Sequence, residues 1–394
     1  MREIYLKKKP DLKKIQKKGL LAVKIAQVYA LRIDFLDEKK CRHLSKLYRQ
    51  NIRIGEEDAW RILERKAPKE FFSEIKDIER KPFASASIGQ VHMAKDKTGK
   101  KVVVKIVKQD FKKNFERDVR KLRKLLKFII FFYPKLRKVA DPEGILDDIE
   151  KNTLAELDLR KEALGSERLK KIFLDNKESF KGSKPGFPKI YYNASNKDVL
   201  VTSLVEGKTF DELLEEKKLD YNELLELFYI HGYYMFGIGT FHGDIHPGNL
   251  IKSKDKIYFV DTGAIGEVSE KLRKNLFWFF DALSVYDYKK SAKHLNDMAF
   301  KKLSGKKYSL FEKKFLELYS DFKGKSVSEV SLTKKMMDTI KLGVNSGMEF
   351  EKGMFSIIKS LMYLDGMVIK CKPNAVLLED MRRFIDDYKA IIGE

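Results

Sequence analysis

Apolar and polar positions along the chain predict long helical stretches on either side of a shorter β-rich region. From residue 12 to about residue 66, apolar side chains recur at the spacing that places them on one face of a helix. The same spacing returns over residues 108–175 and dominates the chain from residue 211 onward, apart from a small hairpin at residues 249–261. The pattern therefore predicts a helical start and a mainly helical second half.

The region between these helices has the pattern of short strands. Residues 83–91 and 102–107 are interpreted as two strands, and residues 96–99 between them, Asp-Lys-Thr-Gly, have the composition of a turn. These segments predict a β-hairpin, and residues 199–205 add a further short strand. Strands early in the chain and helices late are typical of an α+β fold.

Length and composition indicate more than one compact region. With 394 residues, of which 43% are hydrophobic, the chain can bury a core larger than that of one small module. We expect an α+β fold of two lobes, with a helical N-terminal extension at residues 1–80. A small β-containing lobe would cover residues 81–205, and a mainly helical lobe residues 206–394.

The formal net charge of +23 narrows the partners to nucleic acid, an anionic membrane surface or a polyanionic ligand. The basic residues form lysine-rich helical faces at residues 6–18, 112–138 and 289–314. They are not interleaved with aromatic residues as in proteins that bind single strands, which disfavours nucleic acid. Ordinary solvated surface is the first interpretation of these faces, and lipid headgroups are the second.

Sequence features also bear on the compartment. The chain opens on a lysine-rich run without a following apolar segment, and its longest apolar runs, residues 128–133 and 224–241, are too short or too interrupted to cross a bilayer. Cys41 and Cys371 fit no metal or redox spacing, which is typical of thiols in a reducing compartment. We expect a cytoplasmic protein without a transmembrane helix, in which any membrane attachment is peripheral.

The sharpest chemical signal is the run His-Gly-Asp-Ile-His-Pro-Gly-Asn at residues 242–249, followed by a short predicted strand. Asp244 precedes Asn249 by five residues, and Asp261 ends the strand, which is the order found in kinase catalytic loops. Because Mg²⁺ prefers hard oxygen ligands beside phosphate oxygens, Asn249 and Asp261 are predicted metal ligands. Asp244 is the predicted group that orients or deprotonates an attacking hydroxyl or water.

A plainer interpretation treats these segments as turns, since Asp and Gly are common turn residues. The combination of spacing, intervening strand and apolar flanks favours the phosphate and metal site. His246 either shapes the loop or contacts a ligand, and both interpretations stay open, whereas His242 is interpreted as structural.

In the first half of the chain, Lys105 lies in the predicted strand 102–107, where alternation places it opposite its apolar neighbours. That is the position of a strand lysine that pairs with phosphates, although a single strand lysine is more often solvated. A loop of small residues precedes the hairpin, and small side chains let backbone N–H groups approach phosphate oxygens. The candidate nucleotide-binding residues of this loop are Ala84, Ser85, Ala86, Ser87 and Ile88.

A lysine at this position needs an acidic partner, and residues 154–162 offer Glu156, Asp158 and Glu162. On a continuous helix, Asp158 and Glu162 share one face and Glu156 points elsewhere, so two separate roles are possible. An ordinary charged helix face is the alternative.

These motifs resemble the UbiB family of atypical kinases, also called AarF or ADCK proteins, over roughly residues 15–270. Their order and spacing are far more specific than any single motif. The residues that carry the resemblance are Lys24-Ile-Ala-Gln27, the small-residue stretch 84–91, Lys105, Glu156-x-Asp158 with Glu162, the loop 242–249, and Asp261-x-Gly263.

The resemblance implies a protein-kinase-like fold that binds ATP or ADP with Mg²⁺, and it implies a role for each motif. Lys105 would contact the α- and β-phosphates and pair with Glu162. The N-terminal extension would fold over the active site, bringing Lys24, with Gln27 beside it, to meet Glu156 and Asp158. That arrangement would block a protein substrate and favour ATP hydrolysis or phosphorylation of a small molecule.

Three positions depart from the family pattern. Ala26 replaces a glycine in the extension, Thr262 replaces the aromatic residue after the metal-binding aspartate, and Ser203 stands where members often carry an acidic hinge residue. Ser203 would leave adenine recognition to the backbone of Ser203, Leu204 and Val205.

The motifs thus predict an ATP- and Mg²⁺-dependent ATPase or phosphotransferase, and the resemblance to the UbiB family implies that it supports isoprenoid quinone or lipid metabolism. Its expected partners are ATP or ADP, an anionic membrane surface or isoprenoid quinone precursor, and enzymes of lipid biosynthesis. Two alternatives stay open, a nucleotide-gated scaffold for such enzymes and a small-molecule kinase of the aminoglycoside or choline type. The apolar C-terminal helices are interpreted as core, with a lipid pocket as the alternative.

Overall fold

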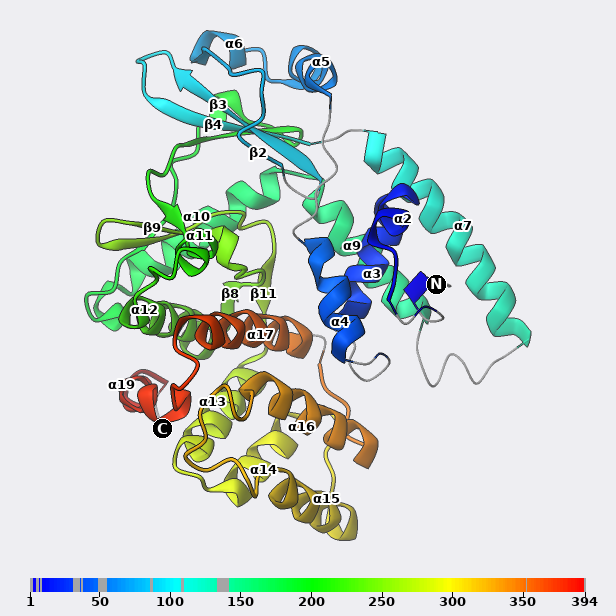
Figure 1. Cartoon of the computed structure of the whole chain (residues 1–394), viewed down its shortest axis with the longest axis vertical. Coiled ribbons are helices and arrows are strands. Elements are labelled where there is room, and N and C mark those ends of the chain that lie inside the picture. The colour runs from blue at the N-terminus through cyan, green and yellow to red at the C-terminus, as the bar shows by residue number, and fades with distance from the viewer. Residues whose placement is uncertain are drawn as a thin grey trace. The chain divides into compact units, whose positions relative to one another are not determined.

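The computed structural model divides the chain into two compact units (Figure 1). Unit 1 comprises Met1–Leu164 and Pro188–Leu204, and unit 2 comprises Gly165–Phe187 and Val205–Glu394. Unit 1 holds a five-stranded sheet and unit 2 is mainly helical, so the predicted α+β class is confirmed. The structure describes residues 3–4, 7, 9–30, 36, 38–48, 55–85, 88–107, 110–132, 142–351 and 353–392.

An antiparallel sheet forms the centre of unit 1, in the order β1-β3-β4-β6, with β2 paired to β3. The predicted hairpin is confirmed, because β3 and β4 pair along their whole length around the predicted turn. Its first strand was predicted with the wrong bounds, because the predicted segment 83–91 contributes to two strands, β2 and β3, which pair so that Ala84 faces Val91 across the sheet. The strands are β1 (Ile75–Lys76), β2 (Ala84–Ser85), β3 (Gly89–Asp96), β4 (Lys101–Val107) and β6 (Val199–Ser203).

The two faces of β4 differ as the sequence pattern predicts. Val102, Val104 and Ile106 are fully buried in a core that includes Leu63 of α5. Burial of each such side chain contributes roughly 1.5–3 kcal/mol to folding. The sheet is therefore fixed against this core, and Lys105 is held on the opposite face.

Helices make up the rest of unit 1, and the predicted helical pattern is confirmed over its described residues. Helix α3 packs against α7 and α9 (Figure 1), and their apolar residues share one core that includes Leu20, Phe115 and Val119. The helices are α2 (Leu12–Lys17), α3 (Leu20–Ala30), α4 (Glu38–Leu44), α5 (Glu56–Lys66), α6 (Phe71–Glu74), α7 (Asp110–Phe132), α9 (Pro142–Glu156) and α10 (Arg160–Asp175), the last of which continues into unit 2.

Unit 2 is a helical body around a large aromatic core that includes Tyr234, Phe241, Phe259 and Phe277. None of the helices in the described part of the chain is long and apolar enough to span a bilayer. The helices are α11 (Phe210–Glu215), α12 (Tyr221–Gly232), α13 (Glu270–Ser284), α14 (Tyr288–Met298), α15 (Gly305–Leu318), α16 (Leu332–Ser346), α17 (Gly353–Cys371), α18 (Leu377–Asp380) and α19 (Arg382–Ile392).

Two small sheets lie in unit 2, one four-stranded in the order β5-β10-β9-β7 and one made of β8 and β11. The hairpin predicted at residues 249–261 is confirmed as β9 and β10. Strands β8 and β11 were not predicted, because three residues are too few to display an alternating pattern. The strands are β5 (Pro185–Gly186), β7 (Lys208–Thr209), β8 (Thr240–His242), β9 (Leu250–Ser253), β10 (Lys256–Phe259) and β11 (Ile265–Glu267).

Candidate active site

The loop after β8 carries Asp244, and His242 fixes its shape. Nδ1 of His242 accepts a hydrogen bond from the Asp244 backbone N–H at 3.1 Å, and Nε2 donates to the Val260 carbonyl at 3.0 Å. Burial lowers the pKa of His242, which keeps the ring neutral, with one nitrogen accepting and the other donating. His242 thus ties the Asp244 loop to the residue before Asp261.

A short turn, Pro247–Asn249, completes this loop. The Asn249 side chain donates through Nδ2 to the Asp244 carbonyl at 3.0 Å, so its other end, Oδ1, is the oxygen that can serve as a metal ligand. Nδ1 of His246 accepts from the Gly248 backbone N–H at 3.0 Å, and the His246 ring packs edge-on against Tyr363. His246 therefore shapes the turn, and its contact with a ligand stays a prediction.

Asp261 follows β10 in an unusual backbone conformation. Its φ of 55° lies in the left-handed region, which few residues other than glycine adopt. Such conformations cost free energy and persist where the surrounding structure holds them, often at functional sites.

Helix α10 is one element that holds this backbone. A Cβ atom added to Gly165 would lie 2.1 Å from the Thr262 carbonyl oxygen, so α10 approaches the Asp-Thr-Gly backbone as closely as only glycine permits. Thr262, which departs from the family's aromatic residue, is almost completely buried at this contact.

Lys359 of α17 was not predicted as a site residue, yet its Nζ lies 2.9 Å from Oδ1 of Asp244. Burial raises the pKa of the Asp244 carboxyl, but the charge and hydrogen bond of the Lys359 ammonium outweigh that effect and hold the pKa below its ordinary value. The Lys359 ammonium also lies over the Tyr363 ring. No sequence signal connects Lys359 to the motif, because the two are far apart in the chain and meet only through packing.

In unit 1, Nζ of Lys105 lies 2.6 Å from Oε2 of Glu162, and both side chains are largely buried. Strand β4 supplies the lysine and the first turn of α10 supplies the glutamate. A short, charge-assisted hydrogen bond of this kind holds the ammonium in one orientation.

The N-terminal extension is joined to the same unit by an ion pair. Lys24 of α3 is buried and pairs with Glu156 at the end of α9. Gln27, one turn later, donates from Nε2 to the Leu47 carbonyl at 3.2 Å, so this contact lies within the extension itself.

Asp158 has a different environment from the one predicted. Helix α9 ends at Glu156 and α10 begins at Arg160, so Asp158 and Glu162 do not share the face of one continuous helix. The Asp158 carboxylate accepts from the Arg160 backbone N–H at 3.1 Å and forms an ion pair with the Arg160 guanidinium, which lowers the pKa of Asp158. Aspartate is preferred at helix starts because its carboxylate accepts hydrogen bonds from the free N–H groups of the first turn. Asp158 makes such a bond between the end of α9 and the start of α10.

The small-residue loop is only partly described. Ala84 and Ser85 form β2, whereas Ala86 and Ser87 lie outside the described residues. The Ile88 side chain lies in the core shared by α3 and α7, so only its backbone could contact a nucleotide.

The predicted hinge falls where the chain passes from unit 1 to unit 2, between Leu204 and Val205. The Ser203 backbone N–H donates to the Lys189 carbonyl at 2.8 Å, and the Leu204 N–H donates to the Lys101 carbonyl at 3.2 Å. These two donors are already engaged, so adenine recognition by this segment would depend on its carbonyl groups or on Val205.

The structure therefore brings the predicted residues together in two sets. Unit 1 holds the ion pairs of Lys24 and Lys105, and unit 2 holds Asp244, Asn249 and Asp261. Within the described residues, no group of three or more His, Cys, Asp and Glu side chains could bind a metal by itself. One amide and one carboxylate form a sparse donor set, which suits Mg²⁺ completed by water and phosphate oxygens.

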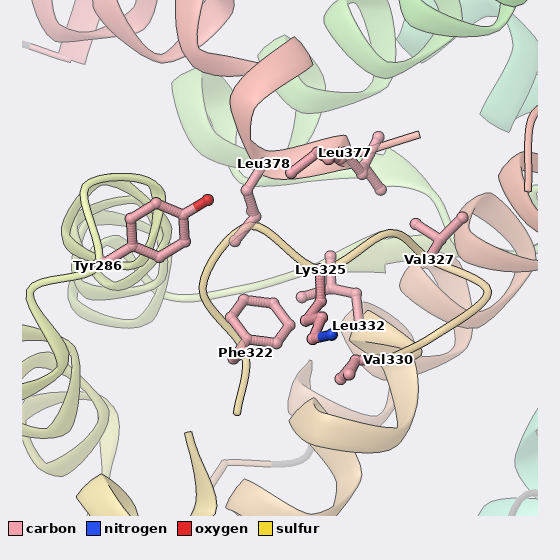
Figure 2. Close-up of a pocket in the computed structure, with 9 residues that line it drawn as sticks. Tyr286, Phe322, Lys325, Val327, Val330, Leu332, Leu377 and Leu378 are labelled. Atoms are coloured by element: carbon pink, nitrogen blue, oxygen red, sulfur yellow. The ribbon is translucent and has the colours of Figure 1, made fainter. Parts of the chain in front are cut away.

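A small cavity lies near the C-terminal helices, in the region where the sequence left a lipid pocket open as an alternative (Figure 2). Apolar side chains such as Phe322, Leu332 and Leu378 line it, together with Tyr286. Its volume is about 10 Å³, close to the minimum for a single water molecule and far below that of an isoprenoid chain. At this location the helices form packed core.

Comparisons with known proteins identify a matching family. Residues 48–295 match the model of the ABC1 atypical kinase-like domain. The chain is 26% identical to "Probable protein kinase UbiB" of Blochmanniella pennsylvanica, across 94% of this chain and 68% of that protein. It is 24% identical to the protein of the same name from Aliivibrio fischeri, across 95% and 69%.

A solved structure shares the fold. The structure of Rv3197 from Mycobacterium tuberculosis in complex with erythromycin superposes with a TM-score of 0.54, covering 88% of this chain and 90% of that one at 19% identity. This likeness concerns the fold alone, and with the family match it confirms the predicted kinase-like class.

Proposed function

The chain belongs to the ABC1 atypical kinase-like family, and from this premise we propose that it is an ATP- and magnesium-dependent enzyme. It would transfer the terminal phosphoryl group of ATP to water or to a small molecule. The observation that carries the proposal is the hydrogen-bonded loop that holds Asp244 and Asn249. In this loop the Asn249 amide donates to the Asp244 carbonyl, and His242 connects the Asp244 backbone to Val260, the residue before Asp261.

Each residue of this arrangement has a role that its chemistry suits. Asn249 and Asp261 would hold the magnesium ion, which, when bound, supplies positive charge that offsets the charge of the phosphates. Asp244 would accept a hydrogen bond from the attacking hydroxyl or water and orient it. Lys105, held by Glu162, would contact the α- and β-phosphates.

The substrate is proposed to be a small molecule or lipid rather than a protein. The ion pair between Lys24 and Glu156 supports this, since it fixes α3 of the N-terminal extension against α9 as part of unit 1. The family resemblance implies that this extension covers the active site, where it would obstruct a large substrate. That implication favours ATP hydrolysis or phosphorylation in isoprenoid quinone or lipid metabolism. Lys24→Ala should then change nucleotide affinity or turnover, and unchanged kinetics would contradict this part of the proposal.

Steady-state phosphate release from ATP tests the proposed function. The wild-type chain should release phosphate only with Mg²⁺, and chelation of the metal should abolish release. Asp261→Asn should lower turnover by about a hundredfold or more, because it removes a negatively charged metal ligand. An Asp261→Asn variant as active as wild type would refute the assignment of this residue.

A further inference from the structure

Helix α7 carries two apolar faces, one buried and one exposed. Phe115 and Val119 are buried in the core of unit 1, and Leu122 and Leu126 continue the same face toward the C-terminal end of the helix. Their spacing places them on one side of the helix, which accounts for its packing against α3 and α9.

A second apolar row follows another side of α7. Leu125, Phe128 and Phe132 are 52%, 64% and 59% exposed, and spacings of three and four residues align them in one stripe. The rings of Phe128 and Phe132 are in contact, with their centroids 5.0 Å apart. Single exposed apolar residues are ordinary, but a contiguous row of large ones marks an interaction surface.

Basic side chains border this row. Lys121 and Lys124 are exposed and stand one helical turn before Leu125 and Phe128. Residues 119–132 contain five basic residues and no acidic residue. Arg123 is paired with Asp147 and Glu150 of α9.

We propose that the C-terminal half of α7 is a docking surface for an anionic lipid bilayer. The helix would lie in the plane of the membrane surface, with its exposed apolar row among the headgroups and upper acyl chains and its lysines against lipid phosphates. The lysines favour a membrane over a protein partner, because lysine is depleted from protein–protein interfaces while it is typical of membrane-surface helices. This surface is independent of the proposed phosphoryl transfer, since it needs no residue of the candidate active site.

Vesicle flotation of the full chain tests the proposal. The wild-type protein should float with vesicles of mixed phosphatidylglycerol and phosphatidylcholine and not with phosphatidylcholine alone, and added salt should weaken the binding. The variant Leu125→Ser/Phe128→Ser/Phe132→Ser should bind these vesicles at least about tenfold more weakly, because three large side chains no longer enter the membrane. All three side chains are exposed, so its thermal unfolding should match that of wild type.

Charge and position are tested separately. Lys121→Glu/Lys124→Glu should lose the preference for anionic vesicles. The matched control is Phe300→Ser/Leu310→Ser, which removes exposed apolar side chains from unit 2, near basic residues of α15. This control should bind vesicles as wild type does.

Three results would overturn the proposal. The first is wild-type protein that stays unbound by anionic vesicles, and the second is a triple-serine variant that binds them as wild type does. The third is a concentration-dependent dimer that the triple-serine change abolishes without any effect on vesicles, which would assign the row to self-association.

Discussion

At the scale of single residues, alternation along a strand was enough to place Lys105. Val104 and Ile106 are buried on one face of β4, and Lys105 meets Glu162 on the other. Lys359 could not be found in this way, because its contact with Asp244 joins α17 to a loop distant in sequence. Asp158 was expected to share a helical face with Glu162, but the helix is interrupted: α9 ends at Glu156 and α10 begins at Arg160, where the Asp158 carboxylate accepts from the Arg160 N–H.

Lys359→Met should lower the kcat of ATP turnover by roughly tenfold to a hundredfold, because Asp244 loses the cation that orients its carboxylate. Without that cation the pKa of Asp244 rises, because burial raises it and the main group that opposes burial is gone. Steady-state kinetics should show the loss in kcat more than in KM, with Lys359→Arg restoring part of it.

The matched control for this change is Lys370→Met, which removes an exposed lysine from the same helix. It should leave kcat unchanged. Equal kinetics for Lys359→Met and Lys370→Met would show that the contact with Asp244 has no part in turnover.

At the scale of elements, the β3–β4 hairpin could be predicted because its turn composition and flanking apolar runs agree. The antiparallel pairing of β2 with β3 could not be predicted, since no local pattern reveals which strands pair. The close approach of α10 to the Asp-Thr-Gly loop could not be predicted either, because a glycine within a helical pattern, here Gly165, does not indicate which segment packs against it.

Gly165→Ala tests that approach. Alanine alone would favour the helix, but the new Cβ collides with the Thr262 carbonyl, so we expect a loss of about 1–3 kcal/mol of unfolding free energy. The displaced loop should also weaken binding of Mg²⁺-ATP, as measured by titration calorimetry.

Gly366→Ala is the control, because a Cβ at this helical position meets nothing within 4 Å. It should stabilise the protein by about 0.5–1 kcal/mol in denaturant unfolding and leave nucleotide binding intact. A Gly165→Ala variant that behaves like Gly366→Ala would contradict the packing described for α10.

The β3–β4 turn should make stability depend on acid pH. Hydrogen bonds from the Thr98 side chain above all, and from the Lys100 backbone and Tyr191 hydroxyl, hold the pKa of Asp96 at about 2, below its ordinary value of 3.8. Because the folded pKa is the lower one, this stabilisation is present above pH 3.8 and is lost as the pH falls toward 2.

Asp96→Asn should therefore have a lower unfolding free energy than wild type at pH 7. The difference between the two proteins should become smaller as the pH approaches 2. Urea unfolding at several pH values measures both effects. Asp77→Asn, which removes a carboxylate paired with Lys95 at the exposed surface, should change stability less. If the difference in unfolding free energy between wild type and Asp96→Asn stayed constant from pH 7 to pH 2, the lowered pKa of Asp96 would not be its cause.

At the scale of the whole molecule, early strands and late helices were enough to predict an α+β chain, and the motifs with their family resemblance were needed to predict the kinase-like class. The exchange of segments between units could not be predicted: residues 165–187 belong to unit 2, and residues 188–204 return to unit 1. Strand β6 returns because β4 offers it an edge for pairing, which no local pattern reveals. The same holds for the candidate site: each of its motifs could be found in the sequence, but the residues that pack against those motifs could not.

If this chain uses ATP through the Asp244 loop, wild type and Asp244→Asn should differ in phosphate release but not in Mg²⁺-ATP binding, and both quantities can be measured on the two proteins side by side. Asp244→Asn should bind Mg²⁺-ATP with wild-type affinity but release phosphate at least about a hundredfold more slowly, because the attacking group is no longer oriented. Nucleotide binding by both proteins with no phosphate release by wild type, or with equal release by the two, would contradict this use of ATP.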